Sequence, residues 1–310
     1  MLVPGGSPPG RHGPVDRRAT LREVIRDDLR DRLLARIGLS VPPPADADGL
    51  RTVHRAFLTS VPYEDLAVQL GETAPLDPDG LVARVLRGGR GGYCFEANTV
   101  LLALLEALGF AVERRQGIVG PRESRAEAKA TNHMALVVDA GGRRFLADAG
   151  LGEGPLDPLP LRAGRYAAGP LHWTLERDGD GWWFEQHAWG SVPGFWFADA
   201  PSGLAAFQPH HERLSTWPES SFVQTLVVQR PCREHIVTLR ARTLSVDGPG
   251  VRRRDVLPDA AAFATTLRSV FGIDPGALGR ERLGRLWARA VQQHDAHVAR
   301  QLGATAAGAG

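Results

Sequence analysis

The chain has 310 residues, which is enough for one large domain or for two or three small ones. Apolar residues make up 43 % and charged residues 23 %, as in an ordinary globular protein, and 37 basic against 35 acidic residues leave a net charge of +2. This balance gives no reason to expect a nucleic acid or an anionic membrane as a partner. The single lysine, Lys129, leaves almost no candidate for Schiff-base or phosphate-loop chemistry.

The first third of the chain predicts helices. Residues 1–18 are rich in Pro, Gly and charge, and we expect a disordered tail there. In the helix that follows, Thr20 and Glu23 fit a capping box, and the prolines at 42–44 end it. Three more helices are expected at about residues 50–60, 79–86 and 93–108. Gly109 is the expected C-terminal cap of the last one.

After Gly109, apolar and polar residues alternate and turn signals recur, for example at Gly141-Gly142. This pattern predicts β-strands up to about Leu244. The chain then returns to helix, with a face formed around Phe263 and a longer helix at about residues 277–302. Helices followed by strands and again by helices favour an α+β fold over alternating βαβ units.

Two cysteines, Cys94 and Cys232, are too few for a disulfide framework and favour a reducing compartment. The N-terminus lacks the apolar stretch of a signal peptide. The most apolar run, residues 99–112, contains Glu106 and is too short to span a bilayer. We therefore expect a soluble, cytoplasmic protein.

Cys94 lies in the most informative segment, residues 87–98, which is Arg-Gly-Gly-Arg-Gly-Gly-Tyr-Cys-Phe-Glu-Ala-Asn. The glycines permit a sharp turn and place Cys94 in the first turn of a helix. Free backbone N–H groups and the helix dipole stabilise a thiolate there, and they can lower its pKa from about 8.5 to roughly 3.5–7.5. Arg90 adds positive charge. A buried structural cysteine is the alternative for Cys94 and the favoured interpretation for Cys232.

The segment from Asn132 to Asp148 contains a candidate base and a candidate orienting carboxylate for this thiol. It predicts a β-hairpin closed at Gly141-Gly142. With a two-residue loop, Asp148 is a diagonal neighbour of His133 on the same face, about 7–8 Å away between backbones. A four-residue loop would place the two directly opposite each other, whereas an odd-length loop would separate them. A satisfied histidine at a strand start and a turn-capping aspartate are the alternatives.

Other groups of residues give weaker indications of a functional site. The sequence has no Gly-x-Ser-x-Gly elbow and no Gly-x-x-x-x-Gly-Lys phosphate loop. The group His210-His211-Glu212 and the pair His294 and His297 lack zinc spacing with a third ligand. We expect no metal and give these histidines solvated or supporting roles.

With these residues in view, the chain resembles the arylamine N-acetyltransferase family between about residues 20 and 300. The order and spacing of several segments make the resemblance specific. The matching segments are Arg90–Glu96 with Asn98, His133 before an apolar strand, Asp148–Gly152, Val61–Leu66 (for Pro-Phe-Glu-Asn-Leu) and Ser215–Phe222 (for Ser-Thr-x-Pro-x-Ser-x-Phe).

The resemblance implies an α+β fold of three parts with a cysteine-protease-like Cys-His-Asp arrangement. On this basis we expect an N-terminal helical bundle with the nucleophile at residues 19–109 and a central antiparallel β-barrel with His and Asp at 110–225. A C-terminal α/β lid is expected at 226–302, and residues 303–310 are expected to be a second disordered tail.

The resemblance also implies a ping-pong acyl transfer. The Cys94 thiolate would attack acetyl-coenzyme A, a co-substrate, and the acetyl group would then pass to a small aromatic amine. His133 would hold the thiolate as an ion pair and relay the proton, and Asp148 would fix the imidazole. Neither a metal nor a tightly bound cofactor is expected.

Aromatic residues line the acceptor pocket of the family, and Phe222 matches one of them. Tyr63 and Leu151 stand where phenylalanine is usual, so these three are the expected substrate-binding residues. Gly150 and Gly152 are the expected positions where the backbone approaches coenzyme A closely. Within the Val61–Leu66 segment, Asp65 replaces an asparagine.

Three alternatives remain open at this point. An amide synthase could use the same triad to close a macrolactam from a carrier-bound polyketide. A thiol hydrolase or transglutaminase-like enzyme shares the chain order Cys, His, Asp. A non-catalytic binding module would carry an ordinary, slowly reacting Cys94.

Overall fold

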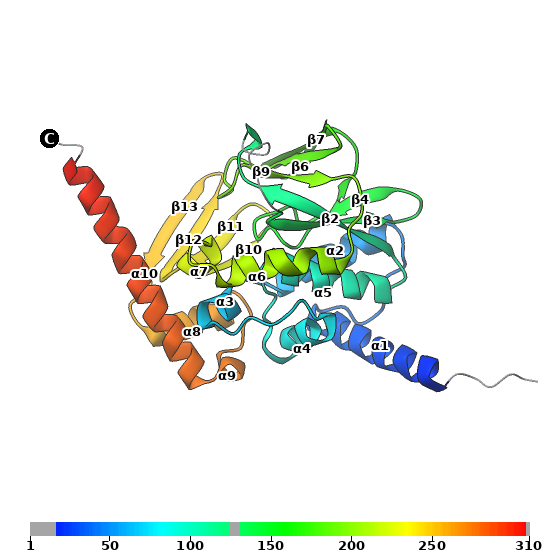
Figure 1. Ribbon diagram of the computed structural model, residues 1–310, viewed down its shortest axis with the longest axis horizontal. Coiled ribbons are helices and arrows are strands. Elements are labelled where there is room, and N and C mark those ends of the chain that lie inside the picture. The colour runs from blue at the N-terminus through cyan, green and yellow to red at the C-terminus, as the bar shows by residue number, and fades with distance from the viewer. Residues whose placement is uncertain (1–16, 124–130, 308–310) are drawn as a thin grey trace, which may run out of the picture.

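The structure of the protein is a computed structural model that describes residues 17–123 and 131–307, with side chains described for 27–123 and 131–303. A group of N-terminal helices packs below a curled antiparallel sheet, and a second sheet with the C-terminal helices lies beside them (Figure 1). The predicted α+β fold is confirmed. Most of the two predicted tails and the side chains of the predicted capping box, Thr20 and Glu23, lie outside the described residues.

The N-terminal part is helical, as predicted, but it also contains a short strand. Its elements are α1 (Arg17–Arg36), α2 (Ala47–Ser60), β1 (Tyr63–Glu64), α3 (Leu66–Leu70), α4 (Pro78–Gly88) and α5 (Cys94–Ala107). Local sequence explains several helix starts. Asp46 accepts hydrogen bonds from two backbone N–H groups at the start of α2, and Asp77 accepts one at the start of α4, where Pro78 follows it. The sequence did not predict β1 or α3.

Helix α5 forms the centre of the main apolar core. It is apolar almost all round because it packs against the other N-terminal helices on one side and against a strand of the large sheet on the other. Fully buried side chains such as Leu101 and Leu104 contribute roughly 1.5–3 kcal/mol each. Asn98 is also fully buried on this helix, and it bonds to the site described below.

The large sheet has eight antiparallel strands in the order β5-β4-β3-β2-β9-β8-β7-β6 and curls into a nearly closed barrel. Its strands are β2 (Ala111–Val119), β3 (His133–Asp139), β4 (Arg144–Ala147), β5 (Leu159–Pro160), β6 (Gly164–Ala168), β7 (Leu171–Asp178), β8 (Gly181–Glu185) and β9 (Gly194–Ala198). Strand β3 has two apolar faces. Met134 and Leu136 face α5, whereas Ala135 and Val137 join the apolar cluster inside the barrel.

The β3–β4 hairpin has the register predicted for a two-residue loop. Asp139 pairs with Arg144, and Leu136 pairs with Ala147. The turn uses φ of 65° at Gly141 and 74° at Gly142, which is the left-handed backbone required by a type I′ turn. This register places the residue after β4, Asp148, near the start of β3.

The second sheet has five antiparallel strands in the order β1-β10-β11-β12-β13. The elements of this C-terminal part are β10 (Val227–Pro231), β11 (Ile236–Arg240), β12 (Thr243–Gly248), β13 (Val251–Val256), α8 (Ala260–Ser269), α9 (Pro275–Leu278) and α10 (Arg280–Ala307). Because β1 precedes the nucleophile segment and pairs with β10, this sheet is joined directly to the N-terminal part.

The predicted strand region was wrong in two respects: helices interrupt it, and it extends further along the chain. The chain between β9 and β10 is helical, with η2 (Leu204–Phe207), α6 (Gln208–Thr216) and α7 (Ser221–Gln224), and strands continue beyond Leu244 to Val256. Strand β13 is an edge strand with three consecutive arginines, so the alternation typical of a half-buried strand is absent from its sequence.

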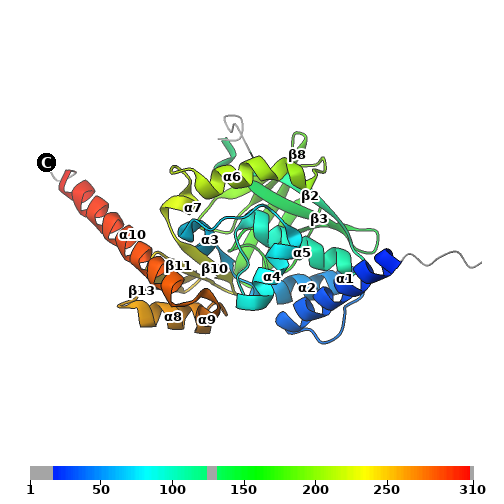
Figure 2. The same cartoon turned by 60° about the horizontal axis from the view of Figure 1, so that its bottom comes forward.

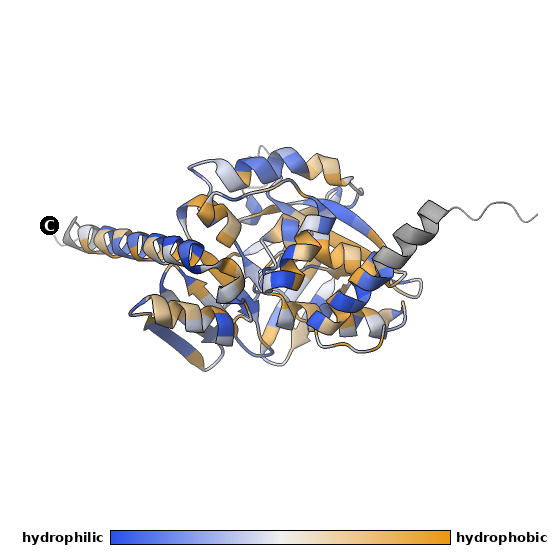
Figure 3. Ribbon diagram, turned by 90° about the horizontal axis from the view of Figure 1, so that it is seen from below, coloured by the Kyte–Doolittle hydropathy of each residue, from blue (hydrophilic) through white to orange (hydrophobic). Residues whose placement is uncertain are grey.

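Helix α10 packs on the C-terminal core in its first half and projects beyond it in its second half. Leu286 and Ala290 are fully buried in the C-terminal core, whereas Leu302 is 67 % exposed. Figures 1 and 2 show the second half of α10 projecting away from the body, and Figure 3 shows the same projection from below. The helix extends to Ala307, beyond the predicted end at Leu302. None of the helices in the described ranges has the length and apolar content needed to cross a bilayer.

The packing of β3 on α5 gives a stability prediction. Leu136→Ala removes a fully buried side chain at this contact and should lower the free energy of unfolding by about 2–5 kcal/mol. Leu302→Ala alters an exposed leucine and should change the free energy of unfolding by less than about 0.5 kcal/mol. Urea unfolding measures both. Equal effects of the two substitutions would contradict the described core.

Candidate active site

Cys94 is the first residue of α5, as predicted, and the preceding glycines explain how it gets there. Gly92 has a φ of 83°, which favours glycine, and a Cβ added at Gly91 would collide with the carbonyl oxygen of Pro62. Glu64, fully buried, accepts hydrogen bonds from the N–H of Gly92 (3.1 Å) and from that of Leu66 (2.6 Å). The turn before the nucleophile is therefore held against β1.

Arg90 does not supply free positive charge to the thiol. Its Nε lies 3.5 Å from Oε1 of Glu64, which compensates the charge. Glu96, in the first turn of α5, accepts from the N–H of Tyr93 at 3.3 Å and from Arg84 at 2.8 Å. These pairs fix the geometry of the helix start and leave little net charge beside Cys94.

His211, expected to be solvated or supporting, is buried against Tyr93, the residue before Cys94. Its Nε2 lies 2.7 Å from the carbonyl oxygen of Ala74, so Nε2–H is the donor there. The Nδ1 atom then accepts from the hydroxyl of Tyr93 at 2.6 Å. Tyr93 also packs against Phe222, with ring centroids 4.7 Å apart.

His133 and Asp148 form a buried pair. Nε2 of His133 lies 2.7 Å from Oδ2 of Asp148, and neither side chain is more than 5 % exposed. Gly117 pairs with His133 across β2 and β3, and a Cβ added there would lie 3.3 Å from Cβ of His133, so glycine leaves space for the imidazole. The ring also packs on Phe195, with centroids 4.5 Å apart. Nδ1 of His133 is the nitrogen not bonded to Asp148.

Asp148 is held from several sides. Its Oδ1 accepts from Nδ2 of Asn98 and from the N–H of Gly150, both at 2.7 Å. Burial alone would raise the pKa of Asp148, but the charge of His133 and the hydrogen bonds from His133, Asn98 and Gly150 lower it below its ordinary value. Asp148 is therefore ionised.

His54 also supports Asp148, and sequence reasoning missed it. Its Nδ1 lies 2.8 Å from the carbonyl oxygen of Leu156, so Nδ1–H donates there, and Nε2 accepts from the backbone N–H of Asp148 at 3.1 Å. This neutral histidine links α2 to the loop that carries the aspartate. The only sequence signal was a histidine on the apolar face of a predicted helix.

The sequence predicted a lowered pKa for the Cys94 thiol, and this prediction was wrong. Burial raises the pKa of Cys94 and the charge of Asp148 adds to the rise, whereas the backbone N–H groups of Phe95 and Met134 oppose it. The thiol donates to the carbonyl oxygen of Asn132 at 3.5 Å. A lone thiolate is therefore disfavoured. Transfer of the proton to His133 leaves the total charge of the site unchanged, and the attraction between thiolate and imidazolium offsets part of this penalty.

Gly150 and Gly152 bring the backbone against Cys94 and β1. A Cβ added at Gly150 would lie 2.8 Å from Cα of Cys94 and 2.6 Å from Nδ2 of Asn98. A Cβ added at Gly152 would lie 2.7 Å from Cβ of Gln229 and 2.8 Å from Cβ of Tyr63. Only glycine fits either position without movement of its neighbours.

The structure separates the three residues predicted to bind the acceptor. Tyr63 lies beside Gly152, and Phe222 packs on Tyr93. Leu151 is only 8 % exposed and joins the apolar cluster inside the barrel. The first two therefore lie on the side of the second sheet and α7, and Leu151 lies on the barrel side.

Asp65, which replaces the expected asparagine, is fully buried. Its Oδ1 accepts from the N–H of Val227 at 2.9 Å. Burial raises the pKa of Asp65 well above its ordinary range, and the neighbouring Glu64 adds to the rise while the Val227 hydrogen bond opposes it. A protonated carboxyl has one acceptor and one donor oxygen, so it can take the place of an amide.

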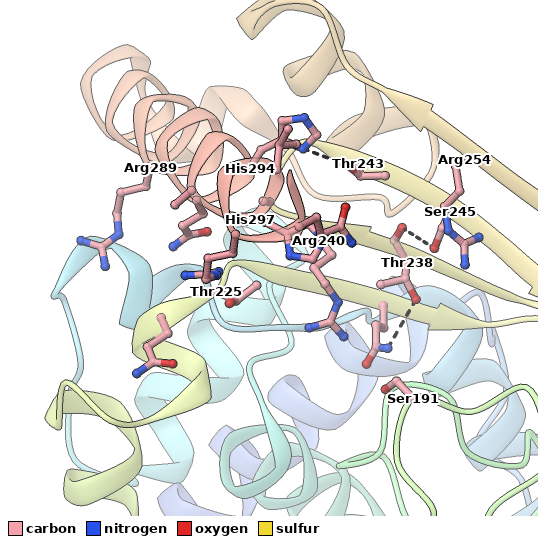
Figure 4. Close-up of a pocket in the computed structure, with 18 of the residues that line it drawn as sticks. Ser191, Thr225, Thr238, Arg240, Thr243, Ser245, Arg254, Arg289, His294 and His297 are labelled. Atoms are coloured by element: carbon pink, nitrogen blue, oxygen red, sulfur yellow. Dashed lines mark hydrogen bonds between the residues drawn. The ribbon is translucent and has the colours of Figure 1, made fainter. Parts of the chain in front are cut away.

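A cleft of about 1180 Å³ lies between the second sheet, α10 and the loop at residues 189–191 (Figure 4). Glu153 and Gln229 line its inner part, and Gln229 is the neighbour of Gly152. The cleft thus begins beside the glycine turn rather than at Cys94 itself. Over the described ranges, no group of three or more His, Cys, Asp or Glu residues is placed to hold a metal ion.

Comparison with known proteins identifies the family to which this fold and site belong. A family model described as N-acetyltransferase matches residues 46–277. The arylamine N-acetyltransferase of Mycolicibacterium smegmatis is 34 % identical over 266 residues, which cover 82 % of this chain and 95 % of that protein. The chain belongs to the arylamine N-acetyltransferase family. The predicted family and the predicted class of enzyme, an acyltransferase, are confirmed.

Solved structures of the family share the fold. The M. smegmatis arylamine N-acetyltransferase superposes with a TM-score of 0.75 at 32 % identity, over 83 % of this chain and 96 % of that one. The Mycobacterium marinum arylamine N-acetyltransferase, solved in complex with CoA, has a TM-score of 0.75 at 28 % identity, over 83 % of this chain and 97 % of that one.

Gly150→Ala tests the close approach at the nucleophile. The added methyl group must displace Cys94 or Asn98, so the rate of acetylation by p-nitrophenyl acetate should fall roughly 100-fold. Gly203→Ala is the control, because nothing lies within 4 Å of a Cβ added there. If the Gly150→Ala enzyme reacted at the parent rate, the described packing of this loop would be wrong.

His54→Gln tests the buried neutral histidine. Burial lowers the pKa of His54, although its bond to Leu156 and the charges of Asp148 and Asp157 oppose this. The unfolded chain binds a proton there at about pH 6.5 but the folded chain only at lower pH, so this site makes stability fall as the pH drops below about 6.5.

The loss of unfolding free energy between about pH 7.5 and about pH 5.5 should therefore be smaller in His54→Gln than in the parent. Urea unfolding at the two pH values measures it. His172→Gln, which removes an exposed histidine of β7, controls for the loss of one imidazole. An undiminished loss in His54→Gln would exclude this linkage.

Proposed function

We propose that the protein transfers an acetyl group from acetyl-CoA to an arylamine, with Cys94, His133 and Asp148 as its catalytic triad. The observation that carries the proposal is the buried 2.7 Å bond between His133 and Asp148, next to a cysteine at a helix start. The family relationship and the CoA complex of the M. marinum enzyme support the donor.

In the first half-reaction, Nδ1 of His133 takes the proton of the Cys94 thiol as the sulfur attacks the thioester carbonyl carbon. Asp148 stabilises the imidazolium that forms. Backbone N–H groups at the start of α5, including that of Cys94, stabilise the oxyanion of the tetrahedral intermediate. The carbon–sulfur bond to CoA then breaks, the CoA sulfur takes the proton from His133, and Cys94 is left acetylated.

In the second half-reaction, the amine nitrogen attacks the acetyl carbon of the thioester. His133 takes a proton from the nitrogen and returns it to the sulfur of Cys94 as the carbon–sulfur bond breaks. The products are the acetylated amine and the free thiol. The charge on Asp148 again favours the protonated imidazole between the two transfers.

We assign the acceptor side to Tyr63 and Phe222, with Leu151 on the barrel side, and the approach of the thioester arm to Gly150 and Gly152. Tyr63 and Phe222 offer aromatic surface for an aromatic amine. The two glycines let the backbone pack directly against Cys94 and Tyr63, which supports placing the reacting thioester beside this turn. The macrolactam-forming alternative gains no support from the relatives named above.

The proposal extends to organisation and location. We assign the bundle to residues 19–109, the barrel to 110–225 and the lid to 226–302. Both cysteines are unpaired, Cys94 buried and Cys232 half-buried, which supports a reducing compartment such as the cytoplasm.

Mass spectrometry of the intact protein tests the nucleophile. Incubation with acetyl-CoA alone should add one acetyl group to the parent and to Cys232→Ala but none to Cys94→Ala. Cys232 is the matched control because it is the other cysteine of the chain. An added arylamine such as 5-aminosalicylate should remove the group.

The remaining outcomes separate the alternatives. An acetyl group that arylamines fail to remove would keep the nucleophile but exclude an arylamine acceptor. Folded parent protein that gains no acetyl group would exclude acetyl-CoA as the donor. Acetylation of Cys94→Ala would exclude Cys94 as the nucleophile.

A further inference from the structure

Helix α10 forms the outer wall of the cleft described above, and it lies beyond the residues that the family model matches. The family model ends at residue 277, whereas α10 begins at Arg280. Residues of α10 nevertheless line the cleft along its second half, among them His294, His297 and Arg300. The opposite wall is the sheet β10–β13, and Figure 4 shows α10 lying over it.

The charges in this cleft are unbalanced. Arg254 is paired with Asp247 at 2.7 Å, so these two charges compensate each other. Arg240, from the end of β11, and Arg300, from α10, are both exposed, and among the described residues neither has a carboxylate at ion-pair distance. Figure 4 shows Arg240 extending into the space between the sheet and α10.

Glu153 is the other carboxylate of the cleft, and it is already engaged. Its Oε1 accepts from the N–H of Ser191 (2.7 Å), the hydroxyl of Ser191 (3.1 Å) and the N–H of Val192 (3.2 Å). The side chain is buried and anchors the loop that forms the third wall. It therefore does not neutralise the arginines by a direct ion pair.

We propose that Arg240 and the exposed half of α10, through Arg300, bind the phosphate groups of the acyl donor. The inference rests on the proposed function, because it takes a coenzyme A thioester as the donor. The phosphates carry the negative charge of this ligand, and guanidinium groups bind phosphate oxygens in a paired, charge-assisted geometry.

The position of the cleft agrees with this role. Its inner end is Gln229, which contacts Gly152, and Gly150 contacts Cys94. The backbone from Gly152 to Gly150 thus connects the cleft to the nucleophile. The turn itself is buried and closely packed, so it separates the inner end of the cleft from Cys94 by only a few residues. We therefore place the thioester of the donor at Cys94 and its charged end in the cleft, between Arg240 and α10. Helix α10 then contributes to donor binding from outside the residues that the family model matches.

Direct binding of CoA tests the proposal independently of acetyl transfer. By calorimetry, Arg240→Gln and Arg300→Gln should each weaken CoA binding at least about fivefold. Arg268→Gln, an exposed arginine on α8 outside the cleft, should bind CoA like the parent. Each substitution removes a charge at an exposed position, and circular dichroism confirms that the variants are folded.

Two donors then separate phosphate binding from a general effect on the site. Acetylation of Cys94 by p-nitrophenyl acetate, which carries no phosphate, should change less than about twofold in both variants, while KM for acetyl-CoA rises with the loss of CoA affinity. Undiminished CoA affinity in both variants, or an equal loss with both donors, would overturn the inference. A parent protein that binds CoA but is acetylated by neither donor would instead refute the proposed function, and the binding data would still decide the role of the arginines.

Discussion

The rest of the site depends on one buried carboxylate, Asp148, because its charge must be stabilised by hydrogen bonds from the surrounding residues. An ionised carboxylate taken out of water loses several kcal/mol of solvation unless the protein replaces its hydrogen bonds. Here α5 provides Asn98, β3 provides His133 and the following loop provides the N–H of Gly150. His54 of α2 holds the backbone of the same residue. The bundle and the barrel are thus joined through the group that orients the imidazole.

The same packing also affects the ionisation of the Cys94 thiol. The loop at residues 150–152 lies so close to α5 that Cys94 is only 2 % exposed, and burial disfavours a lone thiolate. In the proposed mechanism the thiol therefore depends on His133 for its negative charge, because proton transfer to His133 keeps the charge pair together beside Asp148. The helix start contributes N–H groups, but they do not offset burial on their own.

Much of the site could be predicted because its signals are local. The glycines before Cys94, the helix that follows and the Gly141-Gly142 turn each act within a few residues, and the turn alone fixed the register that brings Asp148 near His133. The α+β order of elements followed from the change in periodicity along the chain. These parts required no knowledge of distant contacts.

The parts that sequence reasoning missed depend on contacts between distant segments. His54 acts on Asp148 across 94 positions, and a lone histidine on a helix face gives no sign of this. The pKa of Cys94 was predicted with the wrong sign because its burial by Gly150 is a tertiary effect. Strand β13 was missed because it is an arginine-rich edge strand, whose sequence lacks the alternation of an interior one.

The direction of α10 has a practical consequence for handling the protein. Helix α1 and the free end of α10 lie on opposite sides of the molecule (Figure 1). The second half of α10 borders the cleft, so an affinity tag or fluorescent protein fused after it is attached beside the mouth of that cleft. A polyhistidine tag there would also add charge that depends on pH within reach of Arg240 and Arg300. A fusion placed before α1 is attached on the far side, which makes the N-terminus the better choice for immobilising this enzyme.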